Sequence, residues 1–443
     1  MHYLNGHRPT SFVVQKFLST YRWLFTISSL YEIILLLHTA AVCSLLGLQS
    51  YGILASCLSF VYVMEHVFDA GATNSLPLFF NLFFKSKKNF NYLLWRYTIA
   101  PQVILTVTVT IIAVTFFAYL LPEHFVTYGL ILTVLMIIHG INAFLRQFLY
   151  MALKTKETAS VEFGLLLMHV ASLWSLYFIF QYPITISLYL YLSFIEAVIC
   201  FLIFAYFMMQ LYQTLPDGTR ELPENLFLSL ANNRWWSYVL RMSRVIFSSN
   251  FLTPLFAAHY GFASATIFSL AKKSAKVLQA GLKLCIGYSG NSLFATFKQN
   301  SLAEKQTIFY LLRDKIMRIL FFVIISCMLG ATMLQLFSHE HLAYAPVMFA
   351  ILLITVTCFE TLFTLYEQFY IAEEAAQILA ALKVSELLVL YSIFKSGAST
   401  ATELFAAVLV IRLISFSITA WYAFVRWGIA PLKFESFTHK VNH

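Results

Sequence analysis

The chain has 443 residues, of which 60% are hydrophobic and only 11% are charged. Soluble domains carry roughly a quarter of charged residues, so this composition excludes an ordinary water-soluble fold. The net charge of +9 does not by itself indicate a nucleic-acid partner, because basic cytoplasmic loops give many membrane proteins the same balance. Apolar runs of spanning length recur from end to end, and we therefore expect an all-α, polytopic membrane protein.

The N-terminal twenty residues are polar and basic rather than an apolar signal sequence, so we expect the first span to act as its own insertion signal. Twelve candidate transmembrane helices then follow in chain order. They cover residues 24–46, 51–72, 94–121, 126–150, 160–181, 184–212, 235–257, 262–288, 307–337, 342–370, 375–397 and 402–428.

Lysine and arginine outside these spans gather almost entirely on one side, with Lys395 alone on the other. Arg146, Arg313 and Lys383 are counted with the connections on the basic side. The positive-inside rule then predicts a multi-pass protein of the cytoplasmic (inner) membrane with both termini in the cytoplasm.

The longest inner connection divides the chain into two halves of six spans. We expect an N-terminal lobe over residues 1–212, a cytoplasmic loop over 213–234 and a C-terminal lobe over 235–443. The halves look related, because "SYGILASCLSF" (50–60) opens the second span and "HYGFASATIFS" (259–269) opens the eighth. An even number of spans per repeat predicts parallel, pseudo-symmetric lobes, as in transporters that rock one lobe against the other.

Six basic residues lie inside two adjacent spans. They are Arg241 and Arg244 in the seventh span and Lys272, Lys273, Lys276 and Lys283 in the eighth. A lysine at the membrane centre costs roughly 2.5–3.5 kcal/mol, so these side chains must face water, counter-charges or a ligand. Arginine and lysine are both suited to phosphate. We therefore expect them to line a cavity that binds a pyrophosphate group.

Acidic and histidine side chains lie in other spans: Glu32, Glu65, His66, Asp69, Glu360 and Glu367. Two interpretations stay open for them. They could bind a coupling Na⁺ or H⁺, or they could pair with the basic residues and hold the lobes together. The single histidines His38, His139 and His169 are interpreted as packing or hydrogen-bonded core residues. No cofactor beyond a coupling ion is expected, and no metal site, because the six cysteines form no CxxC pair.

Three segments carry a family resemblance. They are "LGLQSYG" at 46–52, "GINAFLRQFLYMALKTKETASVE" at 140–162 and "HYGFASATIFSLAKKSAKV" at 259–277. They resemble the MOP exporter superfamily, and more closely its branch of O-antigen-type flippases for lipid-linked oligosaccharides. The resemblance implies a V-shaped, MATE-like fold of twelve helices in which spans one, two, seven and eight line a central cavity. One departure is that "SGNSLF" lacks the proline that many relatives place nearby.

The leading hypothesis is a flippase for a polyprenyl-pyrophosphate-linked oligosaccharide in cell-surface polysaccharide biosynthesis. Its partners would be this anionic substrate and membrane lipids, without nucleic acid, and we expect a monomer. The chain has no GxxxxGK motif, and we expect neither ATP hydrolysis nor another enzyme activity. One alternative is a MATE-type cation-coupled multidrug antiporter, for which an acidic cavity would be expected. A membrane glycosyltransferase or polymerase is the other, and it would need a larger outer loop.

Overall fold

The computed structural model describes residues 10–69, 80–95, 128–152, 154–218, 375–395 and 401–429, with further positions within 107–118, 235–273, 301–321 and 362–373. The described residues form helices and no strand. The all-α fold expected from composition is therefore confirmed.

Seven long helices match predicted spans. They are α1 (Thr10–Leu46), α2 (Leu48–Asp69), α7 (Leu130–Met151), α8 (Thr155–Phe178), α9 (Ile186–Gln213), α16 (Ala376–Lys395) and α17 (Ala401–Trp427). They correspond to spans one, two, four, five, six, eleven and twelve. The main difference is at α1, which begins at Thr10, well before the predicted span. Spans three, seven, eight, nine and ten lie wholly or partly outside the described residues.

Five of the described helices are long and apolar enough to cross a membrane: α1, α7, α8, α9 and α17. Helix α2 is not among them, and its position explains why. It packs against α1, α7 and α9, and it carries buried Ser56, Ser59 and Glu65. Because most of its surface meets protein rather than lipid, polar residues are tolerated in it when they find partners.

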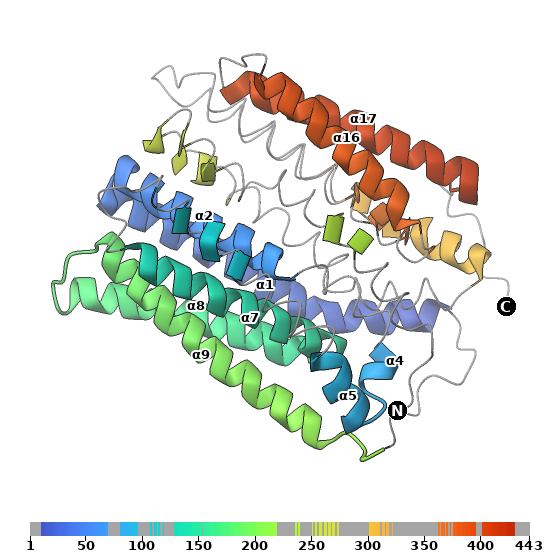
Figure 1. Cartoon of the computed structure of the whole chain (residues 1–443), viewed down its shortest axis with the longest axis horizontal. Coiled ribbons are helices and arrows are strands. Elements are labelled where there is room, and N and C mark those ends of the chain that lie inside the picture. The colour runs from blue at the N-terminus through green and yellow to red at the C-terminus, as the bar shows by residue number, and fades with distance from the viewer. Residues whose placement is uncertain are drawn as a thin grey trace.

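The two largest described clusters of buried apolar side chains lie in different halves of the chain. One joins α1, α2, α7, α8 and α9 through residues such as Leu54, Leu135 and Leu190. The other joins α16 and α17 to the 308–316 and 362–370 segments through residues such as Phe309 and Tyr366. Figure 1 shows α16 and α17 together along one side of the molecule and α7, α8 and α9 along the other. The boundaries expected at residues 212 and 235 stay a prediction.

Glycine joins consecutive helices in the same way at two places. Gly47 has a φ of 79° and Gly261 a φ of 83°, a left-handed conformation that glycine adopts without steric cost. The N–H of Gly47 donates to the Cys43 carbonyl, and the Gly47 carbonyl accepts from the Tyr51 N–H. Gly261 makes the equivalent bonds, four residues back and four residues on. By backbone conformation, Gly261 in the second half corresponds to Gly47 in the first half. The alignment of "SYG" with "HYG" in the sequence instead pairs Gly261 with Gly52, which has no positive φ.

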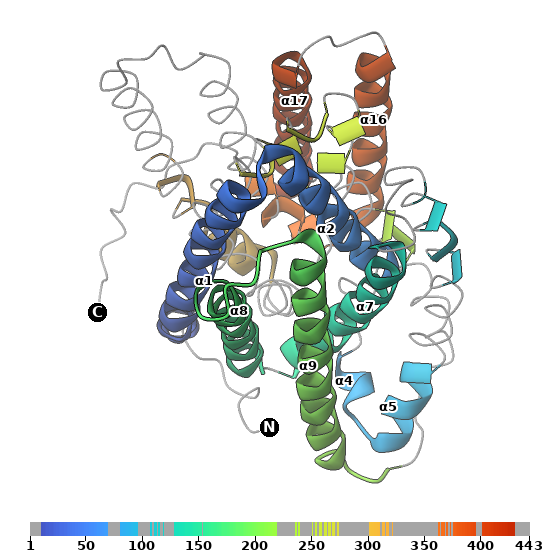
Figure 2. The same ribbon diagram turned by 90° about the vertical axis from the view of Figure 1, so that its left-hand side faces the viewer.

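Helices α1 and α2 meet at Gly47, at one end of the bundle (Figure 2). After α2, the next described helices are two short ones, α4 (Phe80–Phe83) and α5 (Lys87–Leu93). We call this pair of helices the elbow. Ser86 caps α5 through its hydroxyl, which accepts from the Asn89 N–H. Lys87 pairs with Asp217 at 3.0 Å, which fastens the elbow to the chain after α9.

Candidate functional site

The predicted site residues divide into two groups. Those outside the described residues are Arg241, Arg244, Lys272, Lys276, Lys283 and Glu360, and the side chains of His66 and Asp69. The structure describes Lys273, Glu32, Glu65 and Glu367, and the site is built from these four and their neighbours.

Lys273 connects the eighth span to the first two helices. Its ammonium donates to the Thr39 hydroxyl of α1 at 2.5 Å and reaches the Tyr51 hydroxyl of α2 at 3.4 Å. Both hydroxyl residues are buried and neutral. Among the residues that the structure describes, no carboxylate forms an ion pair with Lys273. A positive charge is therefore held between the two halves of the chain by neutral oxygen atoms, which satisfy its hydrogen bonds without cancelling its charge.

The chain segment that leads to Lys273 lies directly against the start of α2. The Thr266 hydroxyl donates to the Leu48 carbonyl at 2.6 Å. A Cβ atom added to Gly52 would lie only 2.6 Å from the carbonyl carbon of Phe262, so the two backbones meet where the sequence supplies no side chain. We call residues 39, 48, 51 and 52 together with 262, 266 and 273 the inter-lobe contact.

The carboxylate of Glu65 lies inside the N-terminal helices and faces Arg146. The Arg146 Nη1 atom lies 3.9 Å from Glu65 Oε1, and its Nε atom lies 2.6 Å from Glu162 Oε1. Arg146 was expected among the cytoplasmic connections, but the structure places it within α7, where it partly balances two carboxylates. The described ion pair of Glu65 thus lies within its own half of the chain.

A histidine cluster lies beside the inter-lobe contact. His169 Nδ1 is 3.1 Å from Glu196 Oε2, and the His169 and His38 rings meet edge-on with centroids 5.5 Å apart. The Trp174 indole donates to His38 Nδ1 at 3.2 Å. Both histidines are buried, and His38 accepts a hydrogen bond, which agrees with the packing or hydrogen-bonded core roles predicted from sequence, but the ion-pair distance from His169 to Glu196 was not predicted. A signal was present, because Glu196 is the only charged residue in the 28 residues of α9 and therefore needs a polar partner.

Glu32 adds a further carboxylate to the same helices. Its Oε2 atom is buried and has no hydrogen-bond partner among the described residues. Tyr62, which interacts electrostatically with both Glu32 and Glu65, stands against the His139 ring at 5.6 Å. The described interior of the N-terminal helices therefore holds Glu32, Glu65, Glu162 and Glu196 around one arginine.

The C-terminal half contains a buried set of three charges. Glu386 accepts from Lys383 Nζ at 2.8 Å and from Arg412 Nη1 at 3.0 Å. Lys383 also lies over the Phe363 ring, 3.5 Å from its centroid. Lys383 was expected in a cytoplasmic connection, but it is fully buried within α16. Glu367, one of the predicted ion-coupling residues, is buried and interacts electrostatically with Lys383.

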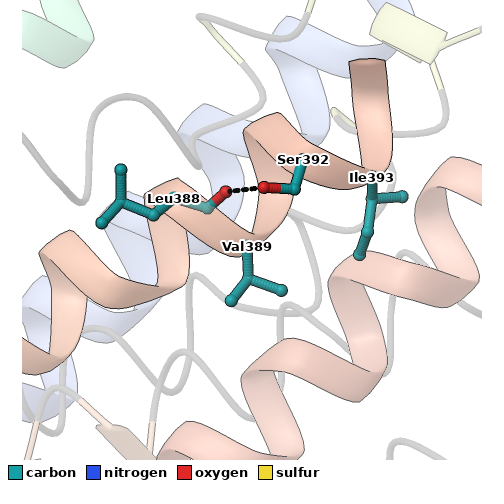
Figure 3. Close-up of a pocket in the computed structure, with 4 residues that line it drawn as sticks. All are labelled: Leu388, Val389, Ser392 and Ile393. Carbon is teal, nitrogen blue, oxygen red and sulfur yellow. Dashed lines mark hydrogen bonds between the residues drawn. The ribbon is translucent and has the colours of Figure 1, made fainter. Parts of the chain in front are cut away.

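A shallow pocket of about 430 Å³ lies on α16 and is lined by Leu388, Val389, Ser392 and Ile393 (Figure 3). The Ser392 hydroxyl donates to the Leu388 carbonyl of its own helix at 2.8 Å. The lining therefore offers no charged group, and this pocket has no part in the site at Lys273.

Comparison with known proteins shows the fold but no close relative. No family model and no curated protein matches the chain. Among solved structures, a MATE in complex with MaL6 aligns at a TM-score of 0.66 and 12% identity over 91% of this chain and 94% of that one. The inward-facing conformation of a multidrug resistance MATE family transporter of the MOP superfamily aligns at 0.61 and 13% identity, with the same coverage.

A MOP superfamily transporter from Pyrococcus furiosus Vc1 aligns at a TM-score of 0.65 and 12% identity, over 91% of this chain and 95% of that one. For that transporter, the reverse polarity of its binding pocket suggests a different function. Similarity across nine-tenths of the chain shows that this protein has the polytopic, all-α fold of MOP superfamily transporters, as its sequence predicted.

Proposed function

We propose that this protein is a membrane transporter that works by alternating access and moves a polyprenyl-pyrophosphate-linked oligosaccharide from the inner to the outer leaflet. The observation that supports this substrate is the environment of Lys273. The ammonium group lies between the two halves of the chain, and its described hydrogen-bond partners are hydroxyl groups. A phosphate oxygen is a stronger partner than a neutral hydroxyl, so an anionic headgroup can displace Thr39 and Tyr51 from the lysine.

The remaining basic residues extend this site in the proposal. Lys273 would present the pyrophosphate to the other cations of spans seven and eight, which are Arg241, Arg244, Lys272, Lys276 and Lys283. The isoprenoid tail would stay in the lipid. The protein would act as a monomer in the inner membrane with both termini in the cytoplasm, and no catalytic step belongs to the mechanism.

Coupling to Na⁺ or H⁺ would supply the driving force, through candidate side chains that include Glu32, Glu65, His66, Asp69, Glu360 and Glu367. Glu32 supports this role best, because one of its buried oxygen atoms has no described partner. The charge of the described interior also supports it, since Glu65 and Glu162 both face the single Arg146 there and Glu32 and Glu196 add two more carboxylates.

That same excess of carboxylates favours a second candidate function. A MATE-type antiporter exports organic cations, which acidic residues in a cavity attract. Several structures with the same fold are MATE transporters. The two functions differ in the sign of the charge that the substrate carries, and Lys273 distinguishes them.

The test is a host that lacks the gene, complemented with Lys273→Ala or Lys273→Arg. We expect inner-leaflet lipid-linked glycan to accumulate in the deletion strain. Lys273→Ala should lower its flipping at least tenfold, while Lys273→Arg should keep part of the activity because the charge remains. Lys154→Ala is the matched control, since Lys154 is exposed and pairs only with Glu157 nearby among the described residues.

Normal glycan flipping by Lys273→Ala would contradict the proposed substrate. Accumulation of an intracellular cationic dye in the deletion strain, without accumulation of glycan, would establish the antiporter instead. Loss of flipping in Lys154→Ala would show that any lysine change disturbs the protein.

A further inference from the structure

His38 and His169 are buried, yet each has a ring nitrogen without a hydrogen-bond partner among the described residues. The atoms are His38 Nε2 and both ring nitrogens of His169, of which Nδ1 lies within ion-pair distance of Glu196 without forming a hydrogen bond. A neutral imidazole has one N–H donor and one acceptor nitrogen, so a ring with a single partner leaves the other atom unsatisfied. Such atoms in adjoining rings need an explanation beyond packing.

The hydrogen bond from Trp174 determines the form of His38. The indole can only donate, so His38 Nδ1 must accept and its proton lies on Nε2. His38 therefore stays neutral while this bond exists.

His169 differs from His38 because it faces a carboxylate. Its Nδ1 atom lies 3.1 Å from Glu196 Oε2, so a protonated ring would have a counter-charge there. The second nitrogen, Nε2, can gain or lose a proton while Nδ1 keeps its contact with Glu196. Glu196 is partly exposed while His169 is buried, so the carboxylate lies at the outer side of the pair.

We propose that the His169–Glu196 pair is the proton-binding site of this transporter, and that its charge controls the inter-lobe contact at Lys273. This inference rests on the proposed transport function and assigns its coupling ion. A proton from water binds His169 Nε2, adds one positive charge, and returns to water when the site is exposed to the other side of the membrane.

The route from this pair to the inter-lobe contact is short. The His169 ring adjoins the His38 ring, and His38 precedes Thr39, whose hydroxyl holds Lys273. A positive charge on His169 repels the Lys273 ammonium through a poorly solvated interior, where charges interact more strongly than in water. Protonation therefore weakens the contact of Lys273 with α1 and α2 and favours separation of the lobes.

Charged and titratable groups surround the pair on every packed helix. They are Tyr31, Glu32 and His38 on α1, Tyr51, Tyr62 and Glu65 on α2, His139 and Arg146 on α7, Glu162 on α8, Tyr189 and Cys200 on α9, and Lys273. Arg146 lies against Glu162 and Glu65, and Tyr189 packs its ring on His169 at 4.8 Å. Of the three histidines in this described group, His169 is the one that lies within ion-pair distance of a carboxylate.

Trp174 offers a readout that does not require transport. Purified protein in liposomes without substrate is titrated with acid, and the emission that is lost in Trp174→Phe is taken as the Trp174 signal. We expect this signal to change with pH in the unaltered protein because a charge on His169 acts on the adjoining His38 ring, to which the Trp174 indole donates. The change should disappear in His169→Gln and shift in Glu196→Gln, and it should persist in His139→Gln, a matched buried histidine of the same helices.

The second readout is glycan flipping under an imposed proton gradient. We expect the gradient to change the flipping rate at least fivefold in the unaltered protein and in His139→Gln, but less than twofold in His169→Gln and Glu196→Gln. A Trp174 titration that survives in both His169→Gln and Glu196→Gln would overturn the assignment, as would gradient-dependent flipping in both variants. A titration that depends on His38 alone would also overturn it.

The two hypotheses fail in different ways. If the Trp174 titration disappears in His169→Gln and shifts in Glu196→Gln but neither the unaltered protein nor any variant moves glycan, the proton site stands and the proposed substrate is wrong. If glycan moves without regard to the gradient or to His169, the substrate stands and the proton site is wrong. Two independent variants keep the test valid should one of them fail to fold.

Discussion

Glu386 is the described buried counter-charge for two cations. It accepts hydrogen bonds from both Lys383 and Arg412, and all three side chains are buried. Glu386→Gln would leave two cations without this counter-charge. We therefore expect it to destabilise the protein by about 3 kcal/mol or more, because an uncompensated buried charge keeps its desolvation penalty. Thermal unfolding of the purified protein in detergent measures the change.

Glu157→Gln is the control for this change. Its partner Lys154 lies at 3.2 Å, but both side chains are about half exposed, and exposed pairs contribute at most about 1 kcal/mol. A Glu386→Gln variant as stable as Glu157→Gln would mean that water or another group compensates the two buried cations.

Helix α2 approaches the eighth span at a position where only glycine fits. Gly52→Ala would place a methyl group 2.6 Å from the Phe262 carbonyl carbon, a distance that requires one backbone to move away. We expect this variant to weaken the inter-lobe contact, lower the thermal stability and slow transport severalfold. Thermal unfolding and the flipping assay on the same preparation measure both effects.

Gly164→Ala supplies the matched control for the same chemical change. Gly164 lies within α8, and a Cβ added there would meet no heavy atom within 4 Å. Alanine is a better helix former than glycine by up to about 1 kcal/mol, so this variant should be neutral or slightly stabilising. If both variants lost the same thermal stability and transport rate, glycine would matter for helix flexibility rather than for the close approach of α2 to Phe262.

At the scale of the whole molecule, alternating access requires the inter-lobe contact to open during each cycle. Leu48 and Thr266 adjoin through the hydrogen bond at 2.6 Å, and because Thr266 is fully buried, Leu48→Cys and Thr266→Cys are to be joined by oxidation to a reducible disulfide rather than by a maleimide reagent. We expect the linked protein to stop transporting and to regain its rate when the disulfide is reduced. Transport by fully cross-linked protein would show that this end of the molecule stays closed throughout the cycle.

The single-cysteine variants serve as controls, because each carries one introduced thiol that can be modified but cannot be linked across the inter-lobe contact. Native Cys43, Cys57 and Cys200 are buried free thiols, which limits their reaction with the oxidant. If transport is inhibited in Leu48→Cys or Thr266→Cys alone, the change at that single position blocks the substrate path, and the loss does not report on the motion of the lobes.

The sequence by itself determined the class and the elements. Apolar runs as long as the hydrocarbon core left little choice other than spanning helices, and the predicted spans coincide with α2, α7, α9, α16 and α17 to within a few residues. The presence of intramembrane charge was equally evident, since each such residue is costly unless it has a partner or a function.

Only the tertiary structure decided which charges meet. Lys383 and Arg146 were assigned to cytoplasmic connections because a linear count treats basic residues near the ends of spans as loop charges. Their partners, Glu386 and Glu162, show instead that both are interior residues. Lys273 could be predicted as a buried cation, but its contacts with Thr39 and Tyr51 join positions more than 200 residues apart. No local pattern encodes such a pairing, because it arises only when two helices pack side by side.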